Sequence, residues 1–334
     1  MGDSPAVPAF ARLFSPLRLG PIEVRNRIVS SGHDTVMAAD GRVTDRLVAY
    51  HEARAAGGVG LIVVQVAGVH PSARYTSSIL MADDDSCVDG LSRLAAVVHA
   101  HGASIVQQLF HDGRELMESG DGTLPVALAP SAVPNERFHV MPRAMPLPLV
   151  REVVASYGDA AARVRAAGYD GVEVVASHGY LPAQFLNPRT NLRDDEYGGS
   201  PQARLRFLRE VLAEARRGTG PDGCVGLRVS VGELSPDGLT EDEVLGALAE
   251  LDADGLVDYV SVVAGTSETL AGSDHIVPPM GTPTAYLAPI GRRVKQVVTV
   301  PVMIAGRIVA PQDAEAVLAA GDADATVMTR ALIC

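Results

Sequence analysis

Short apolar runs alternate with amphipathic stretches along almost the whole chain. The apolar runs are rich in β-branched residues and apolar at successive positions, which is typical of strands buried on both faces. They cover residues 27–31, 60–66, 104–109, 171–176, 224–229, 258–263, 300–305 and 325–328. Helical spacing of apolar positions recurs between them, over residues 44–56, 86–100, 148–167, 202–216, 240–254, 288–296 and 311–319. This alternation predicts an α/β protein whose parallel sheet is covered by helices.

The number of apolar runs distinguishes two α/β architectures. A doubly wound open sheet would show the same local pattern and stays the alternative. Eight runs is the number that a closed (β/α)8 barrel, or TIM barrel, needs, and no GxGxxG turn follows the first run. We therefore predict a TIM barrel in one domain that covers residues 1–334.

Two long segments interrupt the alternation. Residues 112–147 and 265–283 are rich in proline or glycine, show no helical period, and each follows a predicted strand. Long loops after barrel strands usually carry function. We expect both segments to form lids or walls of a pocket.

The chain ends within a few residues of its eighth predicted strand, so it supplies no eighth barrel helix. We expect the sequence to be a fragment of a longer polypeptide, cut just after that strand, with further C-terminal domains.

Composition narrows the classes of function. The net charge of -12 argues against nucleic-acid binding, which needs clustered Lys and Arg. No run of about 18 apolar residues and no signal-peptide pattern occurs, so we expect a cytoplasmic protein that does not use a membrane. Cys87, Cys224 and Cys334 are too scattered for a disulfide framework or a zinc site, and we expect no metal site in this chain.

Candidate catalytic residues follow the fourth apolar run. His178 and Tyr180 flank Gly179 directly after residues 171–176, at the strand end where barrel enzymes carry their chemistry. Both side chains can exchange protons, and the glycine lets a ligand approach closely. The charged residues 193–200 downstream are interpreted as structural, tying the loop to the following helix.

Motifs at six strand ends, in this order, resemble the Old Yellow Enzyme family. They are Arg25-Asn26-Arg27-Ile28-Val29, Gln108-Leu109-Phe110-His111 with Gly113-Arg114, the block from His178 to Ser200, Leu227-Arg228-Val229-Ser230, Ala305-Gly306-Arg307-Ile308, and Met328-Thr329-Arg330-Ala331-Leu332. The chain looks most similar to the large multi-domain branch, which includes 2,4-dienoyl-CoA reductases and trimethylamine, histamine and N-methylproline dehydrogenases or demethylases. That branch often carries a [4Fe–4S] cluster and FAD, which we expect only in a C-terminal region outside this sequence.

The resemblance implies a flavin mononucleotide (FMN) at the C-terminal mouth of the barrel. Its phosphate needs backbone N–H donors and positive charge, which Gly306, Arg307, Thr329 and Arg330 offer after the seventh and eighth predicted strands.

The isoalloxazine ring makes different demands. Gln108 offers an amide that can both donate and accept at the pyrimidine edge. Arg228 can hold positive charge near the N1 and O2 atoms and stabilise the anionic reduced ring. Ser31, Gly32 and His33, leaving the first predicted strand, are expected against the flavin edge.

Three departures from the family pattern shape the expectations. Val175 stands where many relatives carry His or Tyr, so substrate anchoring must differ. Asp34 stands near the place of the cysteine that attaches the flavin in trimethylamine dehydrogenase, so we expect non-covalent FMN. The chain has no Trp, so a strong cation–π cage is not expected, although Tyr75 or Tyr286 could supply a partial one.

Two reactions fit these residues. In the first, which we favour, electrons from NAD(P)H reduce the flavin, hydride passes to an activated C=C, Tyr180 donates the proton and His178 polarises the substrate carbonyl. In the second, a methylated amine is oxidatively demethylated; this reaction is favoured by residues 181–188 and by the loop at residues 277–283, which resemble those of the amine-oxidising members. A binding or scaffolding subunit is a third possibility. We expect a homo-oligomer with a small-molecule substrate, and the choice between NADH and NADPH stays open.

Overall fold

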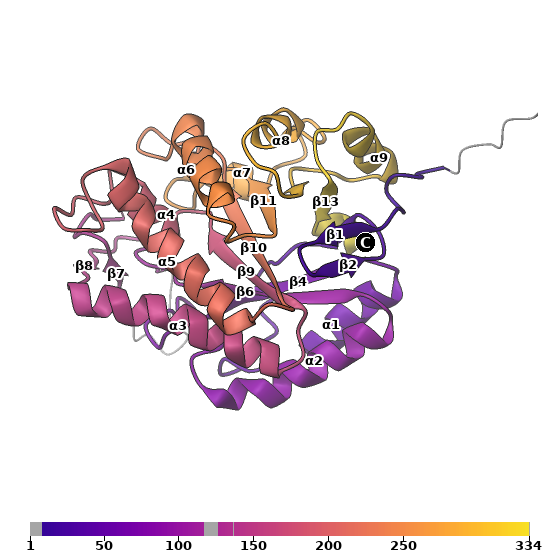
Figure 1. Ribbon diagram of the computed structural model, residues 1–334, viewed down its shortest axis with the longest axis horizontal. Helices are drawn as coiled ribbons and strands as arrows, with labels where there is room; N and C mark the ends of the chain where they lie inside the picture. The colour runs from indigo at the N-terminus through magenta and orange to yellow at the C-terminus, as the bar shows by residue number, and fades with distance from the viewer. Residues whose placement is uncertain (1–8, 117–125, 136, 334) are drawn as a thin grey trace, which may run out of the picture.

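The eight predicted strands form a closed parallel barrel (Figure 1). The computed structural model describes residues 9–116, 126–135 and 137–333. The barrel strands are β3 (Ile28–Ser30), β4 (Leu61–Gly68), β6 (Ser104–Phe110), β9 (Gly171–Ala176), β10 (Cys224–Ser230), β11 (Tyr259–Val263), β12 (Val302–Ile304) and β13 (Ala325–Met328). Because β13 pairs with β3 and β3 with β4, the ring of eight barrel strands is closed. The predicted TIM barrel is confirmed and the open sheet is excluded.

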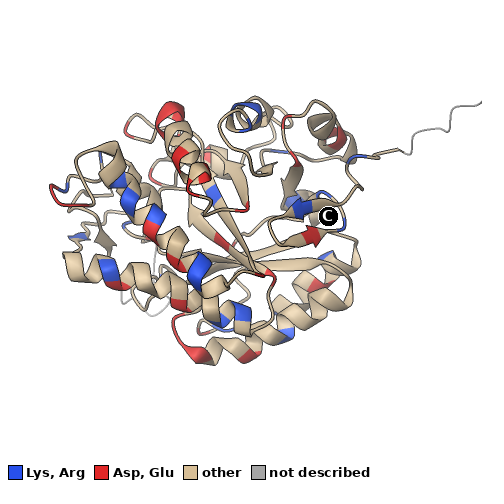
Figure 2. Cartoon of the chain, in the orientation of Figure 1, with Lys and Arg blue, Asp and Glu red and all other residues tan. Residues whose placement is uncertain are grey.

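The predicted helices surround the barrel. They are α1 (Asp45–Ala56), α2 (Val88–Ala100), α3 (Leu147–Ala166), α5 (Pro201–Thr219), α6 (Glu241–Ala253), α8 (Ala288–Val294) and α9 (Pro311–Ala319). Local signals set several of their starts: Thr240 and Glu243 form a capping box at α6, and Ser200 caps α5. Acidic and basic residues are interspersed on the outer helices, for instance along α5 (Figure 2).

A hairpin that the sequence did not predict covers the N-terminal end of the barrel. Its strands are β1 (Leu17–Leu19) and β2 (Ile22–Val24), and its Leu19 and Val24 pack on the inward-facing residues of the barrel strands. Three-residue strands are too short to show a period, which explains the omission. The hairpin thus adds apolar side chains that fill the N-terminal end of the barrel.

Two further helices lie at that open end. The helix α4 (Leu181–Leu186) directly follows Tyr180, and α7 (Leu270–Ile276) lies inside residues 265–283. The prediction that this second segment has no helix was therefore wrong. The Thr269 side chain accepts a hydrogen bond from the Gly272 backbone at 2.9 Å and so starts α7.

The other long segment, residues 112–147, contains only the short pair β7 (Leu128–Ala129) and β8 (Arg143–Ala144) in its described part. Residues 117–125 and 136 of this predicted loop lie outside the described residues. The remaining short elements are β5 (Leu80–Met81), which extends the sheet beside β4, and the 3₁₀ turns η1 (Asp85–Cys87) and η2 (Arg330–Leu332).

None of the described helices has both the length and the apolar character needed to cross a membrane. Cys87 and Cys224 are buried free thiols, and Cys334 lies outside the described residues. Within the described ranges, no group of three or more His, Cys, Asp or Glu side chains is placed to hold a metal ion.

Candidate active site

A cavity of about 750 Å³ opens at the C-terminal end of the barrel. That volume is in the range of small-molecule and cofactor sites. The structure brings together at this cavity every predicted site residue: Ser31, Gly32, His33, Gln108, His178, Tyr180, Arg228, Gly306, Arg307, Thr329 and Arg330. They meet because parallel strands end at the same mouth, so strand-end residues converge whatever their separation in the sequence.

The backbone at His178 is held in the left-handed region, with φ of 62°. Such a conformation costs a non-glycine residue of order 1–3 kcal/mol, so the surroundings must hold it. The His178 amide donates to Ser230 Oγ of β10 at 3.1 Å, and its carbonyl accepts from the Ser267 amide at 3.0 Å. Strands β10 and β11 thus fix the turn that presents His178 to the cavity.

The imidazole of His178 is neutral. Burial lowers its pKa to about 3, with a further lowering from the nearby Arg228. Its Nδ1 lies 2.6 Å from Ser177 Oγ. If that hydroxyl donates, as a neutral ring allows, Nε2–H is the atom free to donate to a ligand.

Tyr180 lies within an aromatic cluster beside His178. Its ring centroid is 5.1 Å from that of Phe110, 6.2 Å from Tyr75 and 5.9 Å from His178. Burial raises its pKa well above the ordinary value, and the carboxylates of Asp34, Glu115 and Asp112 raise it further. The phenol is therefore protonated at neutral pH and is available as a proton donor.

Arg228 is a buried cation that forms no close ion pair with the described residues, although the charge of Glu173 acts on it from a longer distance and partly opposes the lowering of its pKa by burial. It lies on β10 and is 7% exposed. No carboxylate of the described residues lies within 4 Å of its guanidinium, which also makes no hydrogen bond to them. Burial lowers its pKa, the direction expected of a desolvated cation. Because an unpaired buried charge is costly, this arrangement indicates an anionic or strongly polar ligand in the cavity.

Gln108 lies at the end of β6 against Gly32. Its amide nitrogen donates to Glu173 Oε1 at 2.7 Å, and Tyr259 donates to the other oxygen of that carboxylate at 2.9 Å. This leaves the Gln108 carbonyl oxygen and one N–H for a ligand. A Cβ at Gly32 would lie 2.4 Å from the Gln108 amide carbon, so a side chain at this position would displace the Gln108 amide.

The expected phosphate end is formed by the turns after β12 and β13. Gly306 and Arg307 both have positive φ, 114° and 57°, and so turn the chain sharply across the mouth. The two guanidinium groups also contact the loop at residues 277–283: Arg307 donates to the Thr282 carbonyl, and Arg330 donates to the Pro278 carbonyl at 2.7 Å. The sequence placed these arginines at the cavity but gave no sign of this second contact.

His33 and Asp34 follow β3 at the cavity wall. His33 Nδ1 donates to the Ser31 carbonyl and Nε2 accepts from the Tyr50 hydroxyl, both at 2.7 Å. Burial lowers the pKa of His33 and keeps it neutral, while burial raises the pKa of Asp34 to about 6. Tyr50 comes from α1 and was not among the predicted site residues.

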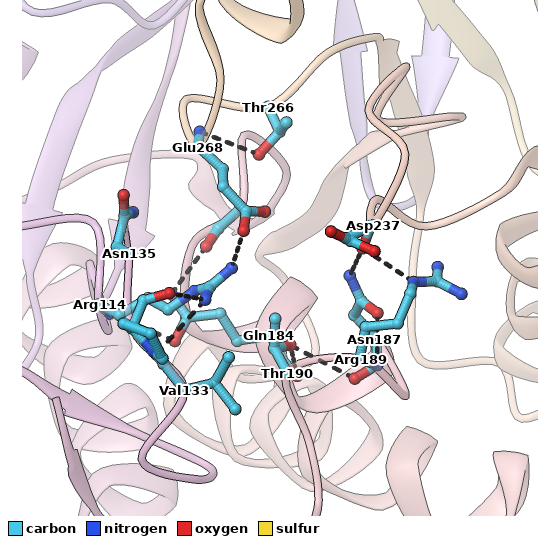
Figure 3. A network of polar contacts seen from close by, with 12 residues as sticks. Arg114, Val133, Asn135, Gln184, Asn187, Arg189, Thr190, Asp237, Thr266 and Glu268 are labelled. Carbon is cyan, nitrogen blue, oxygen red and sulfur yellow. Dashed lines mark hydrogen bonds and ion pairs between the residues drawn. The ribbon is translucent and has the colours of Figure 1, made fainter. Parts of the chain in front are cut away.

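A polar network that includes Arg114, Gln184 and Glu268 lies among the segments that follow the barrel strands (Figure 3). Arg114 donates to Glu268 Oε1 at 2.5 Å and to the Pro134 carbonyl at 2.8 Å, and its amide donates to Gln184 of α4 at 3.3 Å. Glu115 accepts from Ser267 Oγ at 2.5 Å. The network joins the segments after β6, β9 and β11. The sequence gave Arg114 only as part of a motif, without a role.

The structure also locates the remaining residues that the sequence singled out, namely Val175, the two tyrosines of a partial aromatic cage and the charged run at residues 193–200. Val175 and Tyr75 line the cavity, whereas Tyr286 does not and instead donates to the His275 carbonyl at 3.1 Å. Glu196, in the charged run, lies 3.7 Å from Arg206 of α5, as the structural interpretation expected, and it also pairs with Arg151 of α3 at 2.8 Å.

These residues fit FMN. A flat ring needs apolar walls, and Val175, Val263 and Val327 line the cavity. Its pyrimidine edge needs a fixed amide and a cation, which Gln108 and Arg228 could provide, and the Arg228 guanidinium forms no close ion pair among the described residues.

The fold is a TIM barrel, and the cavity at its C-terminal end is lined by residues that fit FMN. A family model described as "NADH:flavin oxidoreductase / NADH oxidase family" matches residues 12–334, and the chain belongs to that family of FMN-dependent NAD(P)H oxidoreductases. The family predicted from the motifs, the Old Yellow Enzyme family, is thereby confirmed.

Individual matches include members of the multi-domain branch. The chain is 38% identical over 321 residues to a metal reductase of Desulforamulus reducens and 36% identical over 330 residues to an N,N-dimethylglycine/sarcosine dehydrogenase of Chromohalobacter salexigens. These matches cover 96% and 97% of this chain and 47% of each relative. A solved 2-naphthoyl-CoA reductase is similar with a TM-score of 0.87 and 27% identity, over 96% of this chain and 50% of that one. The chain thus spans about half the length of these relatives.

Proposed function

We propose that this chain binds FMN non-covalently and reduces an activated C=C of a small molecule with electrons from NAD(P)H. The observation that carries the proposal is the pair formed by Tyr180 and His178. A firmly protonated phenol and a neutral imidazole face one cavity, with ring centroids 5.9 Å apart. Reduction of a polarised alkene needs one proton donor and one hydrogen-bond donor to the carbonyl, which is this combination.

Bound FMN supplies the hydride chemistry. Gln108 and Arg228 would hold its pyrimidine edge, and the backbone from Gly306 to Arg307 with Thr329 and Arg330 would hold its phosphate. Asp34 carries no sulfur with which to attach the ring, which supports non-covalent binding.

The substrate would lie over the ring between the same two side chains. His178 Nε2–H would donate to the substrate carbonyl oxygen and draw electron density from the conjugated carbon. Tyr180 would then deliver its proton to the adjacent carbon, and its high pKa keeps it protonated until the carbon becomes basic. The aromatic cluster and the Arg114 network exclude water and hold both groups in place.

Amine oxidation is the second candidate, because Asp34 lines the cavity with a carboxylate that makes no ion pair within the described residues. Such a group can hold a substituted ammonium ion beside the ring. One relative is a dehydrogenase of N-methylated amino acids, which adds support.

An anaerobic absorbance titration of the flavin-loaded protein tests both candidates. Bleaching by NADH or NADPH and recovery of colour with an enone would support alkene reduction. Bleaching by a methylated amine alone would support the second candidate. A protein that cannot be loaded with flavin would contradict both. A cytoplasmic location and a homo-oligomeric state remain predictions.

A further inference from the structure

Arg137 is a cavity-lining cation to which the proposed FMN contacts assign no role. It lies in the segment between β7 and β8, and its guanidinium reaches across to the loop after β11. There Nη1 donates to the Ser267 carbonyl at 2.5 Å and to Ser273 Oγ. These two contacts hold the charge beside the turn that carries His178, whereas Arg228, Arg307 and Arg330 are the arginines assigned to FMN in the proposed function.

The charge of Arg137 is not neutralised within the described protein. No carboxylate of the described residues lies within 4 Å of its guanidinium, and both of its hydrogen bonds go from Nη1 to uncharged oxygens. The Nε and Nη2 edge therefore has N–H groups to offer. A guanidinium edge of this kind binds a carboxylate through two parallel hydrogen bonds.

Arg137 and the catalytic pair are joined by one serine. Ser267 donates to the His178 carbonyl through its amide at 3.0 Å and through Oγ at 2.9 Å, while its own carbonyl accepts from Arg137. An anion bound to Arg137 would thus lie close to the group that His178 polarises. A nicotinamide nucleotide carries its nearest phosphate beyond a ribose, so this short reach favours a carboxylate on the reacting molecule itself.

We propose that Arg137 binds the carboxylate of the substrate, which is a small organic acid whose reacting bond lies a few bonds from that group. This inference rests on the proposed function for the position of the reacting bond. It adds a substrate class, organic acids, and this class applies to both candidate reactions, alkene reduction and amine oxidation.

The test compares an acid with its neutral ester. The probes are (E)-4-oxopent-2-enoate and its methyl ester, each mixed with the pre-reduced, flavin-loaded full chain, and kcat/KM is measured for both. Wild type should prefer the acid, and Arg137→Gln should lose about 10- to 100-fold of that preference, as expected for a charge-assisted contact. Arg137→Lys should recover part of it. Arg143→Gln, an exposed arginine of the same segment that does not line the cavity, should keep the full preference.

Three results would overturn the proposal. One is an equal loss for acid and ester in Arg137→Gln, which would indicate a structural role. Another is a slower reduction of the flavin by NADH or NADPH with the acid preference intact, which would assign the arginine to a nucleotide phosphate. The third is a wild type with no preference for the acid.

Failure of the proposed function would look different. If cyclohexenone and both enone probes fail to reoxidise the flavin, alkene reduction is excluded. The proposed contact between Arg137 and a substrate carboxylate is then tested by measuring ligand binding. Dissociation constants of N,N-dimethylglycine and its methyl ester, from spectral titration of the oxidised flavin, should differ in wild type and converge in Arg137→Gln. Equal dissociation constants for the acid and the ester in wild type would contradict the role of Arg137 as a carboxylate-binding residue. Unchanged flavin content and melting temperature show that the variants are folded.

Discussion

Replacing Tyr180 by Phe removes one hydroxyl and leaves the aromatic cluster in place. The ring contacts with Phe110 and Tyr75 do not involve the hydroxyl, which makes no hydrogen bond to the described residues. No buried group loses a partner, so the free energy of unfolding should change by no more than about 0.5 kcal/mol. Flavin content should also be unchanged, because the proposed function assigns Tyr180 to the substrate and not to FMN.

The expected kinetic effect is large and confined to one half-reaction. A positioned general acid contributes about 10²- to 10⁴-fold, or about 3–5 kcal/mol of barrier at 1.36 kcal/mol per tenfold. Because the pKa of Tyr180 is raised well above its ordinary value, the wild-type phenol is protonated at neutral pH. Its removal should therefore cost the full rate enhancement of a general acid. Reduction of the flavin by nucleotide needs no proton from Tyr180 and should keep its rate.

Anaerobic stopped-flow absorbance separates the two half-reactions. The flavin is first reduced by NADPH or NADH and then mixed with cyclohexenone, and both rates are compared in wild type and Tyr180→Phe. Tyr157→Phe is the matched control, because this buried tyrosine of α3 does not line the cavity. Equal reoxidation rates in Tyr180→Phe and wild type would refute the assignment of the proton to Tyr180.

Three other predictions test the supporting structure. Arg228→Leu should lower FMN affinity at least about tenfold by fluorescence titration, yet raise the melting temperature of the apoprotein, because it removes an unpaired buried cation; an apoprotein that melts lower would contradict this account. Arg114→Met should cost about 3–5 kcal/mol in urea unfolding, because it leaves the partly buried carboxylate of Glu268 without its partner; a loss below about 1 kcal/mol would show that the network is not needed. Burial raises the pKa of Glu115 to about 8 from an ordinary 4.5, so the folded state binds the proton more tightly and stability should fall as pH rises across that interval. Glu115→Gln should flatten this dependence in melting curves between pH 5 and 9, and an unchanged slope would exclude Glu115 as its source.

The sequence allowed prediction of the barrel and of the cavity residues for the same physical reason. Strands buried on both faces must be apolar throughout, and residues that end them, such as Gln108 and Arg228, must converge in a closed parallel barrel. Neither inference needs knowledge of contacts between distant residues.

The features that the sequence missed depend on such contacts. Arg114 and Glu268 are separated by 154 positions, and nothing local to either residue indicates the other. The contact of Arg330 with Pro278 spans 52 positions in the same way. The strands β1 and β2 and the helix α7 are too short to show a period, so only their packing in the fold defines them.

The arrangement of charge around Tyr180 links the two candidate reactions. Burial raises the pKa of Asp34 to about 6, so at neutral pH this side chain is mostly ionised, and its charge is one reason why the pKa of Tyr180 is raised. One cavity thus holds a carboxylate and a phenol whose pKa values are pushed apart, which is how a site assigns acid and base roles to neighbouring groups. A neutral unsaturated substrate would use the phenol, and an ammonium substrate would pair with the carboxylate. Because the charge of Asp34 raises the pKa of Tyr180, removing that charge should lower the pKa of the phenol. The acid role of Tyr180 and the ammonium-binding role of Asp34 are therefore coupled.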